Sequence, residues 1–263
     1  MLSIIIVNYK QPELLRLCLK TLKRTLRPDF DHEIIVADSE ASVESGNVAT
    51  EEFAGIRYIP FKENVGYTRL VNEGVMAAKG DAFFIMNSDI TPLPDSIENM
   101  YGHLKHHPEI GLIGPQLLNL DGSIQQSCFR YYSPLDIVYR RTPLGILPFG
   151  RKAIERFKMQ DKDLTRPCPA DWLSGSALMG SMAAAKKVGP MDKKLFLYMS
   201  DVDWPRRFWE NGYQVVYYPT ARMYHYHHRH SRGRFGMLDS LFNVQTRQHI
   251  FDYLKYLKKY GFR

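Results

Sequence analysis

Short apolar runs alternate with amphipathic stretches along the first hundred residues. The runs at 3–9, 32–39, 55–61 and 81–89 are rich in β-branched and aromatic residues, which is typical of buried strands. Residues 11–26, 68–80 and 94–108 carry apolar side chains at helical spacing, with Pro12 at the start of the first helix and Gly80 as a C-terminal cap of the second. This alternation predicts an α/β fold, with a doubly wound, mostly parallel sheet flanked by helices.

The second half of the chain has a less regular pattern. Residues 111–132 predict short strands joined by a turn at 121–123, and residues 133–170, rich in Pro, Gly, Arg and Lys, predict a mobile loop region. A strand near 176–184, a helix from 201 to 211 with Pro205 in its first turn, and a strand at 213–219 follow. A last helix is expected over 237–260. We therefore expect three parts, 1–110, 111–236 and a basic amphipathic helix at 237–263.

The net charge of +7 lies entirely at the C-terminal end of the chain. Residues 222–263 contain nine Lys and Arg but only two Asp and Glu, whereas the charges of the first 221 residues cancel. This asymmetry favours an anionic partner, either phosphate or a membrane surface. A solvated basic helix without a partner would give the same count. The aromatic residues of this tail alternate with leucines at helical spacing, which favours packing or membrane contact over nucleic-acid binding.

Cysteine content and the lack of long apolar runs indicate the cellular setting. The three cysteines, Cys18, Cys128 and Cys168, have no short spacing, which argues against a disulfide framework or a zinc knuckle. No apolar run approaches the roughly 20 residues of a membrane span, and the N-terminal run is too short for a signal peptide. We expect a cytoplasmic protein, either free or peripheral on the inner face of the cytoplasmic membrane.

Polar residues end several predicted strands, at the edge where such sheets bind ligands. The chain lacks both G-x-G-x-x-G and G-x-x-x-x-G-K-[ST], which argues against a dehydrogenase or a P-loop enzyme. Asp89 could hold a Mg²⁺ or Mn²⁺ that bridges a diphosphate, or it could cap the following helix. Asp201 and Asp203 could stabilise a helix N-terminus, or one of them could be a general base. Spacing alone decides neither case.

A histidine cluster at 225–230 admits a metal site, a pH sensor or a basic patch. A zinc site of four histidines is disfavoured, because neighbours one residue apart cannot easily converge on one tetrahedral ion. Together with nearby arginines, the cluster predicts a donor-rich flap over phosphates. The cluster consists of His225, His227, His228 and His230, and the last three, with Arg229, Arg232 and Arg234, make up the flap.

Seven stretches, taken together and in order, resemble the inverting glycosyltransferases of family 2, in their rhamnosyltransferase-like branch. They span roughly residues 2–262 and read SIIIVNYKQPELLRLCLKTL, EIIVADS, NVGYTRLVNEGVMAAKGDAFFIMNSDI, LLNLDGSIQQS, DWLSGSALM, KKLFLYMSDVDWPRRFWENGYQVVYYPTARMYH and YLKKYG.

The resemblance implies a GT-A nucleotide-sandwich fold with a C-terminal helical region on the acceptor side. Residues 1–110 would bind the nucleotide sugar, and 111–236 would complete the same domain with the acceptor-binding and catalytic half. It implies transfer of a sugar such as rhamnose, with Mn²⁺ or Mg²⁺, in cell-surface polysaccharide synthesis. The donor would be a dTDP- or UDP-sugar and the acceptor a glycan or a lipid-diphosphate-linked glycan. A non-catalytic sugar-nucleotide or glycan-binding module on this fold is the alternative function.

The resemblance also implies residue roles. The expected catalytic base is Asp201, and the expected metal ligands are Asp89 and His225. The donor side comprises Asn8, Asp38, Asn64, Gly66, Asn87 and Ser88. The sugar and acceptor side comprises Trp172, Gly175 and Asp203. The chain departs from the family pattern where Asn87 replaces the first Asp of D-x-D and where Ser200 replaces the Glu of an E-D pair.

Overall fold

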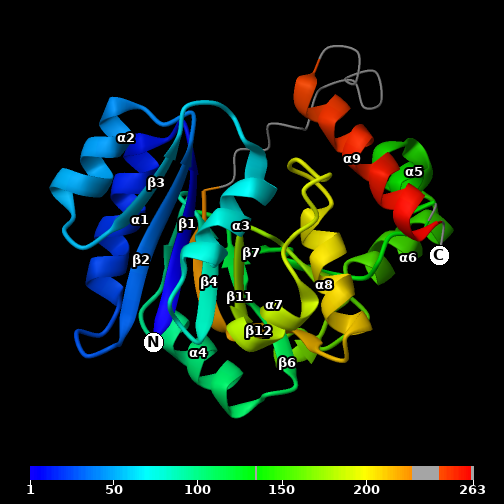
Figure 1. The fold of residues 1–263 in the computed structure, drawn as a ribbon. Helices are drawn as coiled ribbons and strands as arrows, with labels where there is room; N and C mark the ends of the chain where they lie inside the picture. Colours follow the sequence, from blue (N-terminus) through cyan, green and yellow to red (C-terminus); the bar gives the residue numbers. More distant parts are fainter. Residues whose placement is uncertain (134, 227–242, 262–263) are drawn as a thin grey trace.

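The computed structural model describes residues 1–133, 135–226 and 243–261. Within these residues, ten strands form one mixed, mostly parallel sheet in the order β3-β2-β1-β4-β11-β6-β12-β5, with β7 beside β6 and β9 beside β12 (Figure 1). The strands are β1 (Leu2–Tyr9), β2 (His32–Ser39), β3 (Arg57–Phe61), β4 (Ala82–Asn87), β5 (Ile90–Pro92), β6 (Ile110–Leu118), β7 (Ile124–Gln125), β9 (Cys168–Pro169), β11 (Ala177–Ser181) and β12 (Gln214–His225). A separate two-stranded sheet pairs β8 (Cys128–Phe129) with β10 (Trp172–Leu173).

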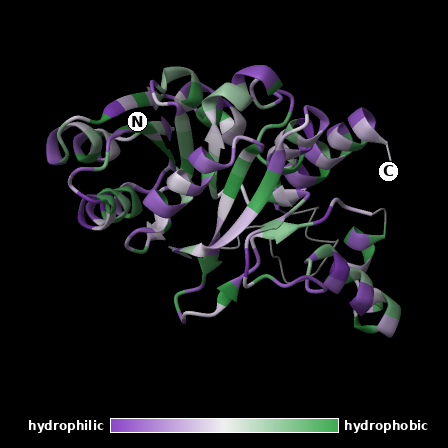
Figure 2. Ribbon diagram, turned by 90° about the horizontal axis from the view of Figure 1, so that it is seen from below, coloured by the Kyte–Doolittle hydropathy of each residue, from purple (hydrophilic) through white to green (hydrophobic). Residues whose placement is uncertain are grey.

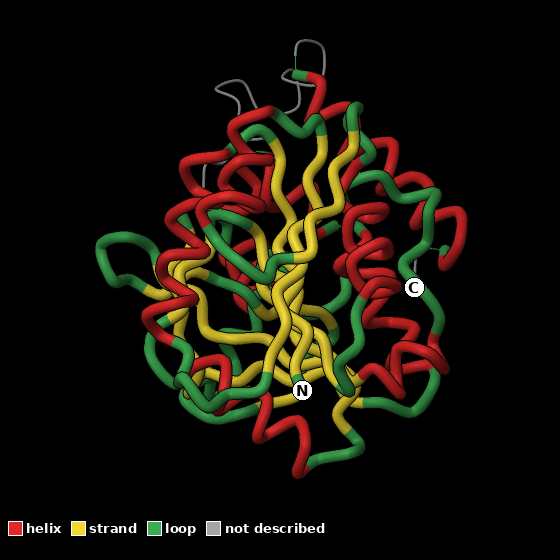
Figure 3. The backbone as a smooth tube through the Cα atoms, turned by 60° about the vertical axis from the view of Figure 1, so that its left-hand side comes forward, coloured by secondary structure: helices red, strands yellow, loops and turns green. Residues whose placement is uncertain are grey.

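Helices cover both faces of the sheet, as the tube view shows (Figure 3). They are α1 (Pro12–Thr25), α2 (Val43–Asn47), η1 (Val48–Glu52), α3 (Gly66–Ala77), α4 (Ser96–His106), α5 (Asp136–Arg141), η2 (Pro143–Ile146), α6 (Pro148–Phe157), α7 (Met182–Val188), α8 (Ser200–Glu210) and α9 (Val244–Tyr260). The predicted α/β fold with flanking helices is confirmed. Among the described residues, no helix has both the length and the hydrophobicity that a membrane-spanning segment needs.

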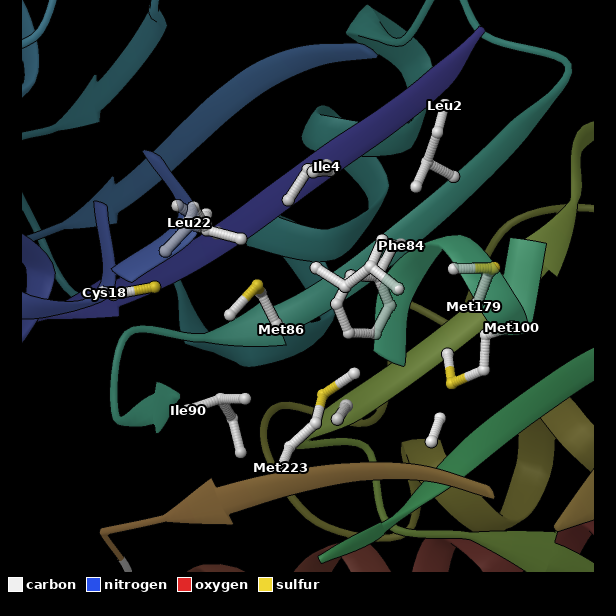
Figure 4. Close-up of a cluster of buried hydrophobic side chains, with 14 of the residues drawn as sticks. Leu2, Ile4, Cys18, Leu22, Phe84, Met86, Ile90, Met100, Met179 and Met223 are labelled. Carbon is white, nitrogen blue, oxygen red and sulfur yellow. The ribbon is translucent and has the colours of Figure 1, made fainter. Parts of the chain in front are cut away.

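Alternate residues of β1 belong to two different hydrophobic cores, one on each face of the sheet. Ile4 and Ile6 pack with α1 and α4 on one face, whereas Ile5 and Val7 pack with α3 and α8 on the other. Figure 4 shows the first of these cores, where Met86 and Phe84 of β4 meet residues of α1 and β12. Figure 2 shows hydrophobic residues gathered along the central strands. Because β1 is covered on both faces, it reads as a continuous apolar run in the sequence.

The strand β11 interrupts the parallel order of the sheet. It runs antiparallel to both β4 and β6, whereas β1 is parallel to β2 and β4, and β6 is parallel to β12. The short β5, which pairs antiparallel with the end of β12, was not predicted. It follows Asp89 directly, and the helix α4 starts later with Asp95 as its N-cap. Asp89 is therefore not a helix cap, which removes one of its two interpretations.

Three local predictions were wrong. The helix α3 ends at Ala77, so Gly80 does not cap it. Residues 133–170 contain the helices α5 and α6 and the 3-10 turn η2 rather than an irregular loop. Pro205 lies in the second turn of α8, because the helix already begins at Ser200. The turn at 121–123 was correct: Asn119 and Ser123 close it with a backbone hydrogen bond of 2.8 Å, and Gly122 adopts a positive φ.

Gly80 is required by close packing of the backbone. A Cβ at this position would lie 2.7 Å from the carbonyl oxygen of Met1 and 2.8 Å from the amide nitrogen of Ser3. Its own amide donates to the Ser3 hydroxyl at 2.8 Å. The residue thus lets the end of the α3 connection pass tightly beside the start of β1.

We expect Gly80→Ala to lower the free energy of unfolding by about 1–3 kcal/mol, because the new methyl group meets backbone atoms that cannot move aside. The matched control is Gly102→Ala within α4, where a Cβ would meet nothing within 4 Å. That change should raise stability by roughly 0.5–1 kcal/mol by restricting the unfolded chain. Urea denaturation of both variants measures the difference, and equal effects would contradict this packing account.

Candidate active site

The carboxyl ends of β1 and β2 carry a buried polar pair. Asn8 and Asp38 are direct partners in the parallel register, and the Asn8 amide donates to one Asp38 oxygen at 2.8 Å. The Tyr58 hydroxyl donates to the other oxygen at 2.8 Å. Burial, reinforced by Asp38, raises the pKa of Tyr58 to about 12, so the phenol stays a donor at neutral pH. Among the described residues, Oδ1 of Asn8 has no hydrogen-bond partner, which leaves a buried acceptor at this edge.

The start of α3 lies beside this pair. The side-chain oxygen of Asn64 accepts from the Gly66 amide at 3.1 Å and lies 3.4 Å from the Ser39 hydroxyl, next to Asp38. Gly66 has φ +76°, and a Cβ there would lie 2.5 Å from the carbonyl oxygen of Phe196. Only glycine meets both conditions without strain. The N-terminus of α3 is therefore held against the loop that precedes α8.

A carboxylate of α9 anchors that loop from behind. Asp252 is fully buried and accepts backbone hydrogen bonds from Phe196 at 3.3 Å and from Leu197 and Tyr198 at 3.1 Å each. The Phe196 carbonyl in turn accepts from the amide of Thr68 in α3 at 3.4 Å. The loop is thus tied to α3 on one side and to α9 on the other.

Asp201 stands in the first turn of α8, directly after this loop. One carboxylate oxygen accepts from the Gly175 amide at 3.4 Å. The Tyr67 hydroxyl donates to the Gly175 carbonyl at 2.5 Å, and a Cβ on Gly175 would lie 2.9 Å from that hydroxyl. Burial raises the pKa of Asp201 to about 6, against the weaker opposing effect of the Gly175 amide. A carboxylate tuned toward neutral pH is suited to accept a proton from a hydroxyl group.

The end of β4 joins this region to the rest of the sheet edge. The backbone amide of Asn87 donates to the carbonyl of Ser176 at 2.9 Å, next to Gly175. The Ser88 amide donates to the Val7 carbonyl at 3.1 Å, next to Asn8. Among the described residues, Oδ1 of Asn87 is buried without a hydrogen-bond partner. These two hydrogen bonds connect the polar ends of β1 and β4 with the segment of Gly175, which contacts Asp201 of α8.

His225 is brought to Asp89 by the pairing of β5 with β12. His225 is the register partner of Ile90, and its Nε2 lies 3.5 Å from Oδ1 of Asp89. Its Nδ1–H donates to Oε1 of Gln125 in β7 at 2.7 Å. Since an amide oxygen can only accept, this bond places a proton on Nδ1, and Nε2 is the ring nitrogen that faces Asp89.

The pair has the donor chemistry of a divalent cation site. Oδ1 of Asp89 is buried and accepts no hydrogen bond from the described residues, and an imidazole nitrogen faces it. Across the described residues, no group of three or more His, Cys, Asp or Glu side chains is arranged to hold a metal. Two protein ligands suit an ion that completes its coordination with substrate phosphates.

Other predicted residues lie elsewhere. Asp203 is fully buried, and its oxygens accept from Lys259 at 2.6 Å, Tyr260 at 2.8 Å and Arg207 at 3.0 Å, which ties α8 to α9. Trp172 is buried in a third core and stacks on Phe129 with ring centroids 4.2 Å apart. Both contacts are structural, so the acceptor-side role of these two residues stays a prediction.

The remaining predictions concern Ser200 and the flap. Ser200 is buried and donates to the Leu197 carbonyl at 3.4 Å, so the residue at the position of the family glutamate supports the helix start. Arg229 and Arg232, with the histidines at 227, 228 and 230, lie outside the described residues.

Four residues of this site were not predicted: Tyr58, Tyr67, Gln125 and Asp252. Tyr67 is adjacent to Gly66, which was predicted, so its place beside the donor stretch was within reach of the sequence. Gln125 and Asp252 act on elements far away in the chain, 100 residues from His225 and 56 from Phe196. No local pattern marks such contacts.

The chain is similar in sequence to known glycosyltransferases. The model of "Glycosyl transferase family 2" matches residues 3–145. An "N-acetylglucosaminyl-diphospho-decaprenol L-rhamnosyltransferase" of Mycobacterium tuberculosis is 30% identical over 246 residues, covering 89% of this chain and 78% of that protein.

Two solved structures share the fold. The mannosyltransferase PcManGT from Pyrobaculum calidifontis, in complex with GDP-Man and Mn²⁺, superposes with a TM-score of 0.62 at 14% identity, over 98% of this chain and 64% of that one. GalNAc-T7 with UDP, GalNAc and Mn²⁺ gives a TM-score of 0.63 at 12% identity, over 86% and 43%. This chain spans less than two thirds of either protein, so the likeness concerns the GT-A fold. The family match and the mycobacterial relative together show that the chain belongs to glycosyl transferase family 2.

Proposed function

We propose that this glycosyltransferase moves a sugar from a nucleoside diphosphate to a hydroxyl group of a lipid-diphosphate-linked acceptor, with inversion at the anomeric carbon. The observation that carries the proposal is Asp201, a partly buried carboxylate with a pKa raised to about 6 at the end of the sheet edge. The mycobacterial relative, by its name, acts on a diphospho-decaprenol and transfers L-rhamnose. A dTDP- or UDP-sugar, with rhamnose first among the candidates, is accordingly the proposed donor.

The donor would lie along the carboxyl ends of β1, β2 and β4. The open acceptor atoms of Asn8 and Asn87 face no partner among the described residues and would serve the nucleotide and the sugar. Asp38, held by Asn8 and Tyr58, fixes the shape of this end. Asn64 and Gly66 set the start of α3, whose backbone amides favour an anionic group.

Asp89 and His225 would hold a Mn²⁺ or Mg²⁺ together with the donor diphosphate. When bound, such an ion would offset the negative charge that develops on the leaving diphosphate. Gln125 holds Nδ1 of His225 and so directs Nε2 toward Asp89, which is the orientation that a metal-binding nitrogen would need.

Asp201 would supply the chemistry of transfer. Its carboxylate takes the proton of the acceptor hydroxyl while that oxygen forms its bond to the anomeric carbon. The bond from that carbon to the diphosphate breaks on the opposite face, and the diphosphate leaves with the electron pair. A single displacement inverts the centre and needs no enzyme nucleophile. Tyr67 and Gly175 hold the base in place, and the loop anchored by Asp252 fixes the start of its helix.

We expect Asp201→Asn to lower kcat by about 10²–10⁴-fold, the usual contribution of a general base, with donor binding retained. The matched control is Asp203→Asn, two residues along the same helix. It should lower stability by roughly 1–3 kcal/mol because it breaks a buried ion-pair cluster, with a smaller loss of kcat. Release of nucleoside diphosphate from dTDP-rhamnose and an N-acetylglucosaminyl-diphospho-prenol measures turnover. Retained turnover in Asp201→Asn would refute the assignment.

The raised pKa of Asp201 predicts the acid limb of the pH profile. The base works only when ionised, so kcat/KM should fall as the pH drops through about 6, whereas an ordinary carboxylate would hold its activity to about pH 4. Initial rates measured from about pH 4 to 8 test this. A limb that appears only near pH 4 would contradict the role of Asp201 as the base.

Metal binding should depend on Gln125. We expect Gln125→Leu to weaken Mn²⁺ binding by about 10–100-fold, the usual loss when the partner that orients a histidine ligand is removed. Gln125→Glu keeps an acceptor for Nδ1–H and should retain binding. Calorimetric titration of Mn²⁺ in the presence of UDP gives the affinity without relying on turnover. Equal affinity in the wild type and Gln125→Leu would exclude His225 as a ligand oriented in this way.

A further inference from the structure

Exposed large apolar side chains concentrate in two short segments of the described chain. Ten of the eighteen such residues lie at 135–149 or 244–254. The first segment covers α5, η2 and the start of α6, and the second covers α9 as far as Leu254. Scattered surface apolar residues are ordinary, but a local concentration marks an interaction surface.

The helix α9 has two opposite faces. Asp252 and Tyr256 are buried against the body of the protein. On the opposite face, Val244, Phe251 and Leu254 are 68%, 58% and 54% exposed. The spacing of seven and three residues places them along one stripe, into which Arg247 and Lys258 also fall. This stripe therefore combines apolar side chains with positively charged ones. The packing of the buried face of the helix does not require apolar residues on this exposed face.

The segment from α5 to α6 lies against α9. Phe157 at the end of α6 shares a core cluster with Tyr253 and Tyr256 of α9, and the three helices lie together at one end of the molecule (Figure 1). Exposed apolar side chains project from this segment as well, with Ile146 83% and Phe149 56% exposed. The two segments thus form one structural unit.

The charges of this unit are mainly positive. A hollow of about 570 Å³ beside α9 is lined by Lys194, Lys255, Lys258 and Lys259, with Asp192 as its one acidic residue. Asp252, the one acidic residue of α9, is buried, and so is Asp136 at the start of α5, whereas Glu155 of α6 is exposed and pairs with Arg151 at 3.6 Å. Apolar side chains next to lysines and arginines match a bilayer surface, where apolar groups enter the acyl boundary and cations meet anionic head groups.

We propose that α9 and the α5–η2–α6 segment form a docking surface for a lipid bilayer that contains anionic lipids. We call it the C-terminal docking surface and define it by Phe251, Leu254, Ile146, Phe149, Arg247 and Lys258. It borders the active site through α9, since the inner face of this helix holds the loop before Asp201. Its use in presenting a lipid-linked acceptor rests on the proposed function, whereas the docking itself does not.

Flotation of the full chain with vesicles tests the proposal. The wild type should float with vesicles of phosphatidylglycerol and phosphatidylcholine, and much less with phosphatidylcholine alone or at high salt. Phe251→Ser with Leu254→Ser should lower partitioning at least about tenfold, because two large apolar side chains no longer enter the bilayer. Arg247→Gln and Lys258→Gln should each lower it roughly fivefold, and only on anionic vesicles.

The matched control is the pair Leu17→Ser and Val43→Ser, which are exposed apolar residues of α1 and α2 on the other side of the molecule (Figure 1). This pair should float like the wild type. The proposal is overturned if the wild type stays at the bottom, if Phe251→Ser with Leu254→Ser floats equally well, or if the surface instead joins two copies of the chain and the same variant turns a dimer into a monomer. Melting curves confirm that each variant is folded.

Turnover with a water-soluble, short-chain acceptor separates this proposal from the proposed function. The docking variants should keep the wild-type rate on that acceptor and lose rate on a long-chain acceptor embedded in vesicles. Flotation without any transfer would leave the surface standing and refute the function. Transfer without flotation would support the proposed function and refute the docking surface.

Discussion

The parallel pairing of β1 between β2 and β4 is the constraint on which the site depends. Both faces of β1 are buried, so a one-residue shift of its register would move each side chain from one core into the other and disrupt the packing of both. That register sets Asn8 opposite Asp38 and Val7 opposite Asn87. The polar ends of three strands therefore meet at one edge because of the packing of the apolar residues that precede them. Chemistry at this edge follows from the hydrophobic core beneath it.

A second constraint is the attachment of α9. Two buried carboxylates hold this helix: Asp252 accepts three backbone amides of the 196–198 loop, and Asp203 of α8 accepts from Lys259 and Tyr260. Unpaired buried carboxylates would be costly, so these contacts must all form together. As a result, the C-terminal helix and the active-site loop behave as one body. The same helix carries the exposed apolar stripe, which links the proposed docking surface to the position of Asp201.

The sequence was informative where the structure is local or periodic. The continuous apolar runs gave β1, β2 and β4, and Asp201 at a helix start could be predicted from its motif, because strand and helix periods are visible in a single chain. Prediction from the sequence failed where contacts between distant segments determine the structure. The residues 136–157 look like a loop because Pro and Gly are frequent there, yet tertiary contacts of Phe157 with Trp172 and Tyr132 support helices. The contacts of Asp203 with α9 are of the same kind: a period of 3.6 residues turns positions two apart to different sides of a helix, and no local pattern shows that Asp203 meets Lys259 and Tyr260.

The tuning of Asp201 has a cost that the surrounding fold offsets. Burial raises its pKa from 3.8 to about 6, so the folded state holds this proton more tightly than the unfolded chain does. Stability therefore falls as the pH rises from about 4 to 6, and the loss, roughly 3 kcal/mol at about 1.4 kcal/mol per unit, persists at neutral pH where the base is ionised. A buried, ionised carboxylate is retained only if neighbouring contacts hold the loop and helix in place. Tyr67, Gly175 and the anchors of α9 provide these contacts around a residue that itself weakens the fold.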